Sequence, residues 1–328
     1  MAPHVRRTVS LPAVAICIPT YRQVDFLQQA LDSLVIQRFT DYEVVITDDS
    51  PDDAVEDLIR SYDFGGRLRY FRNFRPLGSP RNWDEAVRLS SAPLIKILHH
   101  DDQFAHADAL GHFVALMEQN PECAFGFSAS RVEDVTTGAS WVHSVDAEQV
   151  ADLKRRPERL LLGNVIGAPS ATIYRRALGL EFDPRMSWLV DVDFYMRALR
   201  LNPRVAVTDE PLIVTPTGAG HQVTEAVRDD GALQVREALL MFEKAFDQLS
   251  ADPDVALYWW RTLRRHRVRS VKQLARHGEI SPAQTVYFKS LFAHPPRDGR
   301  RRLADFVPAV VRNLWRPVRQ SAARKVRS

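Results

Sequence analysis

Two adjacent carboxylates, Asp101 and Asp102, come directly after the apolar run of residues 93–98. Neighbouring Asp side chains repel each other, so such a pair is tolerated best when water or a divalent cation neutralises it. In loops, Asp pairs are more often solvated turn formers or helix caps. The pair therefore predicts a metal site only if other functional motifs lie around it.

Two further acidic motifs also allow both a structural and a functional interpretation. Asp48 and Asp49 follow a β-rich run, and their simplest role is to cap the helix predicted next along the chain. Asp191 and Asp193 stand at the start of another predicted helix, where carboxylates interact favourably with the helix dipole. A functional interpretation depends on whether the fold brings these carboxylates to one place.

The elements that would carry these residues alternate between strand and helix. Apolar and β-branched runs predict strands at residues 13–18, 42–47, 68–71 and 94–98, and helical spacing predicts helices at 25–37, 54–62 and 83–89. Such alternation implies a mostly parallel sheet, in which the loops after the strands form the ligand crevice. The first two acidic pairs fall at that edge.

The second half of the chain has weaker signals. They predict helices at residues 109–119 and 188–201, strands at 124–129, 205–207 and 212–214, and helical structure beyond residue 225. The sequence has no internal repeat and no low-complexity segment.

Length and composition indicate a globular protein with room for a large core. The chain has 328 residues, of which 45% are hydrophobic and 26% charged. It has only two cysteines, Cys17 and Cys123, which argues against a disulfide framework and fits a reducing, cytoplasmic compartment. There is no run of 18 apolar residues and no apolar segment of the signal-peptide type. A membrane span is therefore not expected.

The net charge of +3 hides a division along the chain. Residues 256–328 contain 18 Lys and Arg against 3 Asp and Glu, whereas residues 1–255 contain 26 against 38. Within the basic segment, apolar residues recur at helical spacing over 303–318, interrupted by Pro308 and Pro317. Such a stretch fits an anionic membrane surface, and fits equally well packing on the protein body or on a second copy in a homodimer.

Taken in order, five motifs resemble those of the family 2 glycosyltransferases, which have the α/β GT-A fold with a mostly parallel central sheet. They are IPTYR at 18–22, VITDDS at 45–50, GSPRN at 78–82, HHDD at 99–102 and DVDFYMR at 191–197. The resemblance implies a GT-A domain at 12–225, with a nucleotide-binding half at 12–105 and an acceptor half at 106–225. An N-terminal segment, 1–11, would precede it, and a helical basic region, 226–328, would follow.

The resemblance assigns Asp101 and Asp102 to a divalent cation, Mg²⁺ or Mn²⁺, which stabilises the negative charge on the leaving diphosphate. His99 and His100 would contact the donor and its ribose together with Asp101. His99 stands where family members often have an Asp. His221, which follows the last predicted strand, is a further candidate ligand for the metal.

The nucleotide-binding residues that the resemblance implies are Pro19, Thr20, Tyr21, Asp48, Asp49, Arg81 and Asn82. Asp49 would accept a hydrogen bond from a pyrimidine N–H, with Asp48 as the alternative, which favours a UDP- or dTDP-sugar donor. Arg81 offers a positive charge to a donor phosphate.

An inverting transfer needs a base that takes the proton from the acceptor hydroxyl. By resemblance this base is Asp191, and Asp193 is the reserve candidate because Val190 replaces the Glu that precedes the family's catalytic Asp. Trp188 could stack on the face of an acceptor sugar.

The expected activity is therefore the metal-dependent, inverting transfer of one sugar from a nucleotide-sugar donor to a glycan or lipid-linked acceptor. Lipopolysaccharide, capsule or glycolipid assembly on the cytoplasmic face of a membrane would use such an enzyme. The Gln-x-x-Arg-Trp motif of processive members is absent. A sugar-nucleotide nucleotidyltransferase is an alternative, but it would need a Gly-rich phosphate loop where PTYR stands at 19–22. A nucleic-acid-binding protein is another, but the acidic body and the lack of a nucleic-acid-reading motif oppose it.

Overall fold

The computed structural model describes residues 11–218, 227 and 230–296. Within this part of the chain, nine strands form one sheet in the order β3-β2-β1-β4-β8-β6-β9-β5, and β7 pairs with β6. The strands are β1 Val14–Thr20, β2 Tyr42–Asp48, β3 Leu68–Arg72, β4 Leu94–Ile97, β5 Gln103–Phe104, β6 Phe125–Asp134, β7 Ser140–His143, β8 Thr172–Arg175 and β9 Val205–Thr217.

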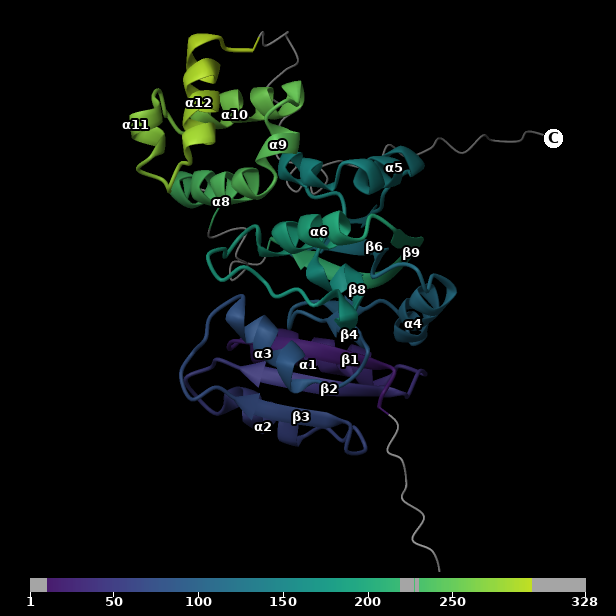
Figure 1. Cartoon of the computed structure of the whole chain (residues 1–328). Coiled ribbons are helices and arrows are strands. Elements are labelled where there is room, and N and C mark those ends of the chain that lie inside the picture. Colours follow the sequence, from purple (N-terminus) through teal and green to yellow (C-terminus); the bar gives the residue numbers. More distant parts are fainter. Residues whose placement is uncertain (1–10, 219–226, 228–229, 297–328) are drawn as a thin grey trace, which may run out of the picture.

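The sheet is parallel in its first half and mixed in its second. Strands β3, β2, β1 and β4 are parallel neighbours, so the ends of β1, β2 and β4 meet at one edge, as predicted. Strand β8 then inserts antiparallel between β4 and β6, while β6 and β9 pair in parallel. The predicted α/β class and the predicted strand–helix alternation are confirmed (Figure 1).

Helices cover both faces of the sheet. In the first part of the chain they are α1 Val24–Val35, α2 Ala54–Arg60, α3 Arg81–Leu89, α4 Ala109–Gln119, α5 Ala147–Arg155 and α6 Val190–Leu201. Short 3₁₀ helices are η1 Pro157–Leu162, η2 Pro169–Ala171 and η3 Arg176–Leu178. Because side chains alternate along a strand, Val14, Ile16 and Ile18 of β1 join the core under α1, α2 and α4. Ala15 and Cys17 join the opposite core with α3 and α6.

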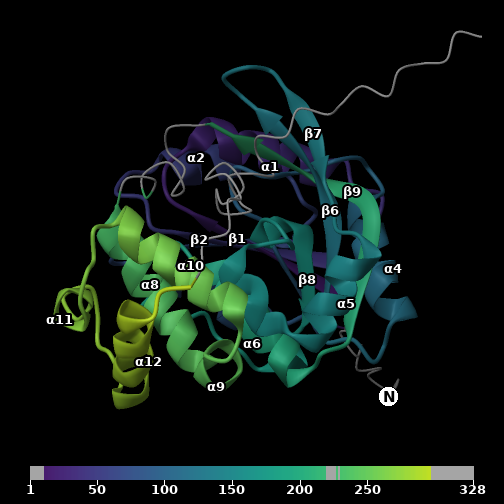
Figure 2. The same ribbon diagram turned by 90° about the horizontal axis from the view of Figure 1, so that it is seen from above.

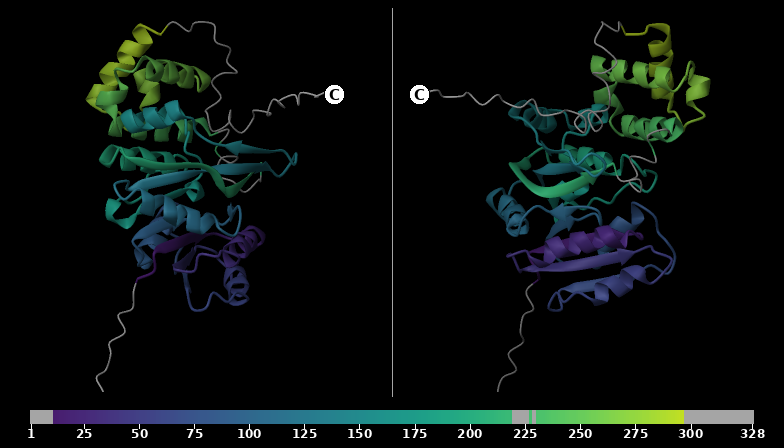
Figure 3. Two further views of the ribbon diagram at one scale, coloured as in Figure 1. Left: turned by 90° about the vertical axis from the view of Figure 1, so that its right-hand side faces the viewer. Right: turned by 180° about the vertical axis from the view of Figure 1, so that it is seen from behind.

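The chain continues as helices after β9, as predicted. They are α8 Gly231–Lys244, α9 Phe246–Leu249, α10 Pro253–Arg265, α11 Val271–Leu274 and α12 Pro282–Ala293. Phe242, Trp259 and Phe288 are fully buried among them and belong to the same apolar cluster as the inner face of α6. Figure 1 shows α8 to α12 in a tier above the level of α6, and Figure 2 shows from above that α11 and α12 lie to one side of it; Figure 3 shows the tiers from the side. The C-terminal helices therefore share one core with the sheet.

One predicted pair of strands is a single strand. The segments predicted at 205–207 and 212–214 form the continuous β9, because the interruption at Pro211 is absorbed by a register shift against β6. The shift lies between Ser128 and Ser130. Strands β5 and β7 were not predicted, because segments of two and four residues have too little periodicity to detect.

Some sequence expectations lie outside the described residues: His221 and the amphipathic stretch at 303–318. None of the helices in the described part of the chain is long and apolar enough to cross a membrane. Cys17 and Cys123 are buried and unpaired with each other.

Candidate active site

A cavity of about 750 Å³ opens at the edge where β1, β2 and β4 end. Its other walls come from η2, the start of α6, and strands β6, β7 and β9. Of the predicted site residues, those that line it are Pro19, Thr20, Tyr21, Asp49, Asn82, His99, His100, Asp101, Asp102, Trp188 and Asp191. Asp48, Arg81 and Asp193 are not among the lining residues. The fold thus brings together motifs that are more than 150 residues apart in the sequence.

His99, Asp101 and Asp102 form a cluster whose potential metal-ligand atoms all lie within 4.8 Å of one another. The imidazole of His99 packs against Trp83 in a tilted arrangement, with ring centroids 4.4 Å apart and an interplanar angle of 60°. Its buried Nε2 has no hydrogen-bond partner. Burial lowers the pKa of His99 to about 4, so the ring is neutral at pH 7 and can offer a lone pair. Two carboxylates and one imidazole suit Mg²⁺ or Mn²⁺.

Lys96 lies beneath this cluster and was not singled out in the sequence. It is fully buried in β4, its Nζ donates to the Ser170 carbonyl oxygen, and it sits 4.2 Å from the ring centroid of Phe113. Burial lowers the pKa of Lys96 to about 7, and the charge of Asp102 opposes that shift. The pKa of Asp102 is raised mainly by burial, and the negative charge of Asp101 raises it further. The sequence does contain a signal for this residue: a lysine inside an otherwise apolar strand indicates a buried positive charge with a negative partner.

Asp49 lies at the rim of the cavity and holds the neighbouring loop. Its carboxylate accepts hydrogen bonds from the backbone N–H groups of Leu77 at 2.9 Å and Gly78 at 2.8 Å, and from Asn73 Nδ2 at 2.7 Å. Asp48 is fully buried and accepts from the Thr20 and Tyr70 hydroxyls and the Ser50 N–H. Asp49 is therefore the one of the two that faces the cavity.

Asn82 and Arg81, at the start of α3, are placed differently. Asn82 is buried, and its Nδ2 donates to the carbonyl oxygens of Thr20 and Thr47 at 3.3 and 3.1 Å. Asn82 thereby ties the ends of β1 and β2 together. Arg81 is exposed and does not line the cavity.

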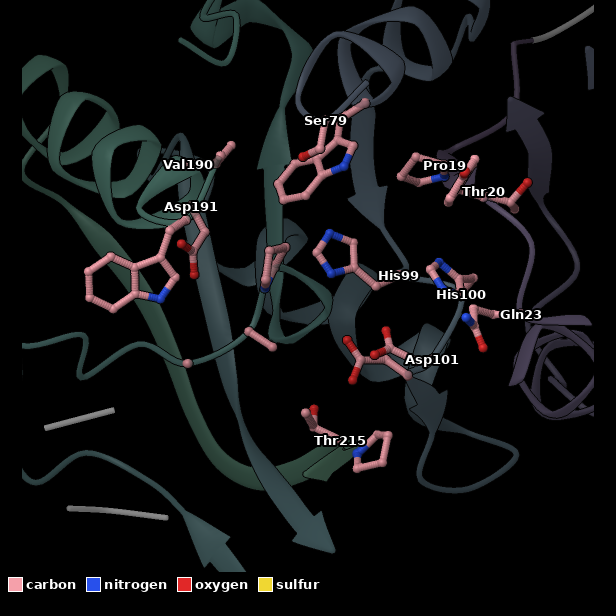
Figure 4. A pocket seen from close by; sticks show the side chains of 18 of the residues that line it. Pro19, Thr20, Gln23, Ser79, His99, His100, Asp101, Val190, Asp191 and Thr215 are labelled. Atoms are coloured by element: carbon pink, nitrogen blue, oxygen red, sulfur yellow. The ribbon is translucent and has the colours of Figure 1, made fainter. Parts of the chain in front are cut away.

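Asp191 lies in the first turn of α6, on the wall opposite the His99–Asp101–Asp102 cluster (Figure 4). Its Oδ2 accepts a hydrogen bond from Asn164 Nδ2 at 3.2 Å. Burial raises the pKa of Asp191 to about 7; the N–H groups at the start of the helix lower it, and the charge of Glu237 raises it. A carboxylate with this pKa, aimed into a cavity, suits general-base chemistry.

Asp193 is only two residues further on, but two residues turn a helix by about 200°. Its side chain is fully buried and pairs with Arg197 at 2.7 Å and with Lys244 at 2.6 Å. Asp193 thus faces away from the cavity and links α6 to α8.

Aromatic side chains gather around the Asp191 end of the cavity. Trp188 precedes α6, and Trp141 and His143 come from β7. His143 Nε2 lies 3.0 Å from the Val165 carbonyl oxygen, whereas the buried Nε1 of Trp141 has no hydrogen-bond partner. The β7 residues were not predicted, because their strand is too short to be detected.

A second group of metal-type side chains lies outside the cavity. His106, His112 and Glu210 have potential ligand atoms within 4.8 Å, and their side chains are 37%, 48% and 40% exposed. His106 Nδ1 accepts a hydrogen bond from the Asp108 N–H, so Nε2 carries the proton that faces Glu210. Hydrogen bonds account for this cluster without a ligand.

The sequence model for Glycosyl transferase family 2 matches residues 15–179, half of the chain, and includes the ends of β1, β2 and β4 described above. The chain belongs to this family. Family membership makes the protein a glycosyltransferase, so the predicted family and enzyme class are confirmed. It also decides against the nucleotidyltransferase and the nucleic-acid-binding alternatives.

Curated relatives of this glycosyltransferase include an uncharacterized protein, MT1568, of Mycobacterium tuberculosis. The two are 28% identical over 268 residues, which cover 76% of this chain and 81% of the relative. An uncharacterized glycosyltransferase of Haemophilus influenzae is 25% identical and covers 57% and 62% of the two chains. The validoxylamine A glucosyltransferase of Streptomyces hygroscopicus subsp. limoneus is 35% identical over 104 residues, which cover 30% of this chain and 22% of that one.

Solved structures confirm the GT-A fold of the glycosyltransferase. The 1–349 fragment of S. aureus TarS in complex with UDP-GlcNAc superposes with a TM-score of 0.56 and 15% identity, over 85% of this chain and 90% of that chain. The mannosyltransferase PcManGT from Pyrobaculum calidifontis, in complex with GDP-Man and Mn²⁺, gives a TM-score of 0.55 and 16% identity, over 94% and 88%.

Proposed function

We propose that this glycosyltransferase moves one sugar from a nucleotide-sugar donor to a hydroxyl group of a glycan or lipid-linked acceptor, with inversion and with the help of a divalent cation. The observation that carries the proposal is the arrangement of the cavity. The His99–Asp101–Asp102 cluster and the Asp191 carboxylate lie on facing walls, so a donor held at the first could be attacked from the side of the second.

The cation would be held by His99, Asp101 and Asp102, whose potential ligand atoms lie close together. The buried Nε2 of His99 has no hydrogen-bond partner in the described structure. Mg²⁺ or Mn²⁺ would supply positive charge to the diphosphate as it leaves. The Mn²⁺ bound with GDP-Man in PcManGT supports this part of the proposal.

The nucleotide would lie against Pro19, Thr20 and Tyr21, which line the cavity next to Asp49. The Oδ2 atom of Asp49 accepts one hydrogen bond, from Gly78, and so has capacity for a second from the N–H of a pyrimidine base. UDP and dTDP both present that N–H, and UDP-GlcNAc is the donor bound in TarS. We therefore propose a UDP- or dTDP-sugar.

Asp191 would take the proton from the attacking acceptor hydroxyl. With its pKa raised to about 7, the carboxylate is a stronger base than an ordinary Asp and is still largely ionised just above neutrality. Asn164 donates to Oδ2 and thus orients the carboxyl group.

The acceptor would enter beside Trp188, Trp141 and His143, because aromatic faces stack on the C–H faces of sugar rings. The abequosyltransferase RfbV of Salmonella typhimurium, 33% identical over 98 residues covering 28% of this chain and 29% of that one, supports the transfer of a sugar. We propose a cell-surface glycan as the acceptor. A lipid-linked acceptor would also suit the basic stretch beyond residue 296, where we propose contact with an anionic membrane surface.

The test begins with a thermal-shift screen of nucleotide sugars, each with Mg²⁺, Mn²⁺ or EDTA. A donor that binds the folded protein raises Tm in proportion to ln(1 + [L]/Kd), and we expect this rise to require the metal. Donors that bind are then incubated with sugar acceptors, and the anomeric configuration of the product is read by NMR. Failure of every nucleotide sugar to bind with either metal would contradict the proposal.

A further inference from the structure

The loop that leads into α6 is held by a carboxylate from α8. Glu237 is fully buried and accepts hydrogen bonds from three consecutive backbone N–H groups, those of Ser187 at 2.7 Å, Trp188 at 2.9 Å and Leu189 at 2.8 Å. The Ser187 hydroxyl donates to the same carboxylate at 2.9 Å. One side chain thus fixes the three residues just before the helix that carries Asp191.

Helix α6 needs such support because it has no cap of its own. Its N-cap residue is Leu189, whose side chain cannot accept a hydrogen bond, and the structure has no side-chain cap there. N–H groups at the start of a helix cost free energy when they are buried without an acceptor. Glu237 supplies the acceptor for the N–H of the N-cap residue Leu189, from a helix 48 residues further along the chain.

A second contact from α8 holds the same segment. Lys244 lies seven residues, or about two turns, after Glu237 and therefore on the same side of the helix. Its Nζ lies 2.6 Å from Asp183 and 2.6 Å from Asp193. Helix α8 therefore contacts the chain on both sides of Asp191: before it at Asp183 and residues 187–189, and after it at Asp193.

We infer that Glu237 is a positioning residue for proton transfer, which holds the loop at 187–189 so that Asp191 faces the acceptor hydroxyl across the cavity. The inference rests on the proposed role of Asp191. Through Glu237 the C-terminal helices support the active site from outside, because no residue of α8 to α12 lines the cavity.

The charge of Glu237 gives this role a signature that a purely structural contact lacks. The ionisable groups that act on or adjoin Asp191 are Glu237 of α8 and Tyr195 of α6, while His143 of β7 and the Asp101–Asp102 pair line the same cavity. Glu237 itself has Arg236 Nη2 at 3.5 Å. Removing the negative charge of Glu237 would lower the pKa of Asp191 and shift the acid limb of the kcat–pH profile to lower pH.

The test compares Glu237→Gln with Glu243→Gln, which removes the same charge from an exposed position on the same helix. We expect Glu237→Gln to lower kcat by about 10- to 100-fold, since a displaced catalytic group costs up to that much, with little change in the donor KM. The acid limb of its kcat–pH profile should move to lower pH. Glu243→Gln should match the wild type both in kcat and in the position of the acid limb. Unchanged kcat together with an unchanged acid limb in Glu237→Gln would overturn the inference.

Hydrogen exchange gives a readout that needs no activity. The amides of Ser187, Trp188 and Leu189 should exchange faster in Glu237→Gln than in the wild type or in Glu243→Gln; equal protection would overturn the inference even if the enzyme proves active. If Glu237→Gln fails to fold, Glu237→Asp keeps the charge with a shorter reach, and a lower kcat with a wild-type acid limb is expected. A wild-type protein that transfers no sugar would instead sink the proposed function, while the exchange result would still stand.

Discussion

The cavity has two walls that are built in different ways. The wall that we propose binds the donor, called the donor wall, lies at the ends of β1, β2 and β4 and contains Asp49 and the His99–Asp101–Asp102 cluster. The wall that carries the proposed base Asp191, called the base wall, consists of residues 187–191 at the start of α6. On the donor wall, the Asp49 carboxylate is bonded to the loop at 73–78, close in the chain and beside the same parallel strands. The base wall is held by Glu237 and Lys244 from α8.

This difference separates what sheet topology provides from what long-range packing provides. Parallel strands must end at a common edge, so polar residues that follow them converge without further help. The start of α6 has no such guarantee, because a helix can rotate or slide on the sheet. On this account the strand ends that form the donor wall lie within the first 105 residues, with one further contact from Ser170, whose hydroxyl accepts a hydrogen bond from the His99 N–H at 2.9 Å. The base wall is held by the C-terminal helix α8.

The largest effect is expected from substituting Asp191 and Asp193, because only one of these two carboxylates lines the cavity. Asp191→Asn should lower kcat by about 10²–10⁴-fold, the usual contribution of a general base. Asp193→Asn removes the buried partner of Arg197 and Lys244, so it should cost about 3–5 kcal/mol of stability while the folded fraction keeps the wild-type pH profile. Steady-state kinetics and thermal unfolding of both variants check this. A loss of turnover confined to Asp193→Asn would move the base to that residue.

The convergence of the donor-wall residues on one cavity could be predicted from the sequence, for a physical reason. Asp49, Asp101 and Asp102 follow apolar strands whose order could be read from period and composition, and the common edge then follows from parallel pairing. His99 was assigned to the donor, and the structure adds that its imidazole lies in a cluster with the Asp101 and Asp102 carboxylates.

The sequence predicted little of what supports the base wall. Asp191 was found only by resemblance, and nothing local distinguished it from Asp193. Glu237 and Lys244 were missed because a contact between residues some 50 positions apart leaves no periodic signal. Arg81 was assigned to a donor phosphate by resemblance. In the structure it is an exposed residue of the first turn of α3 and does not line the cavity, so its role stays a prediction.

The next effect concerns the pH dependence of the base wall. Burial makes the charged form of Asp191 costly and raises its pKa to about 7, and a base acts only when it is deprotonated. With donor and acceptor saturating, kcat should therefore fall about tenfold for each pH unit below 7. Measurements from pH 5 to 9 check this. A kcat that stays constant down to pH 5 would show that a group of ordinary carboxylate pKa, or no base at all, limits turnover.

A smaller effect is expected on the donor wall. Asp49→Asn leaves one acceptor oxygen for the N–H groups of Leu77 and Gly78, and a lost buried hydrogen bond costs about 1–3 kcal/mol. We expect the donor KM to rise by about tenfold with kcat nearly unchanged, and Asp52→Asn, at an exposed position nearby, to behave as wild type. A fall in kcat at constant KM would mean that Asp49 supports the base wall instead.

The smallest effect is on stability. Because the folded-state pKa of Asp191 lies above that of an unfolded Asp, ionising it destabilises the fold at pH values above about 7, and this cost fades as the pH falls. Asp191→Asn should therefore unfold a few degrees above the wild type at pH 8, and the difference should shrink at pH 5. Calorimetry at the two pH values checks this. A lower Tm for the variant at pH 8 would contradict the burial cost assigned to Asp191.

The central claim is that the donor wall binds and the base wall reacts. It is tested most directly by measuring donor affinity with and without Mn²⁺, and kcat at saturating donor, for Asp102→Asn and Asp191→Asn side by side. We predict that Asp102→Asn loses the metal-dependent part of donor affinity, while Asp191→Asn binds donor as the wild type does and fails in turnover. Equal losses of affinity in both variants, or wild-type turnover in Asp191→Asn, would contradict the claim.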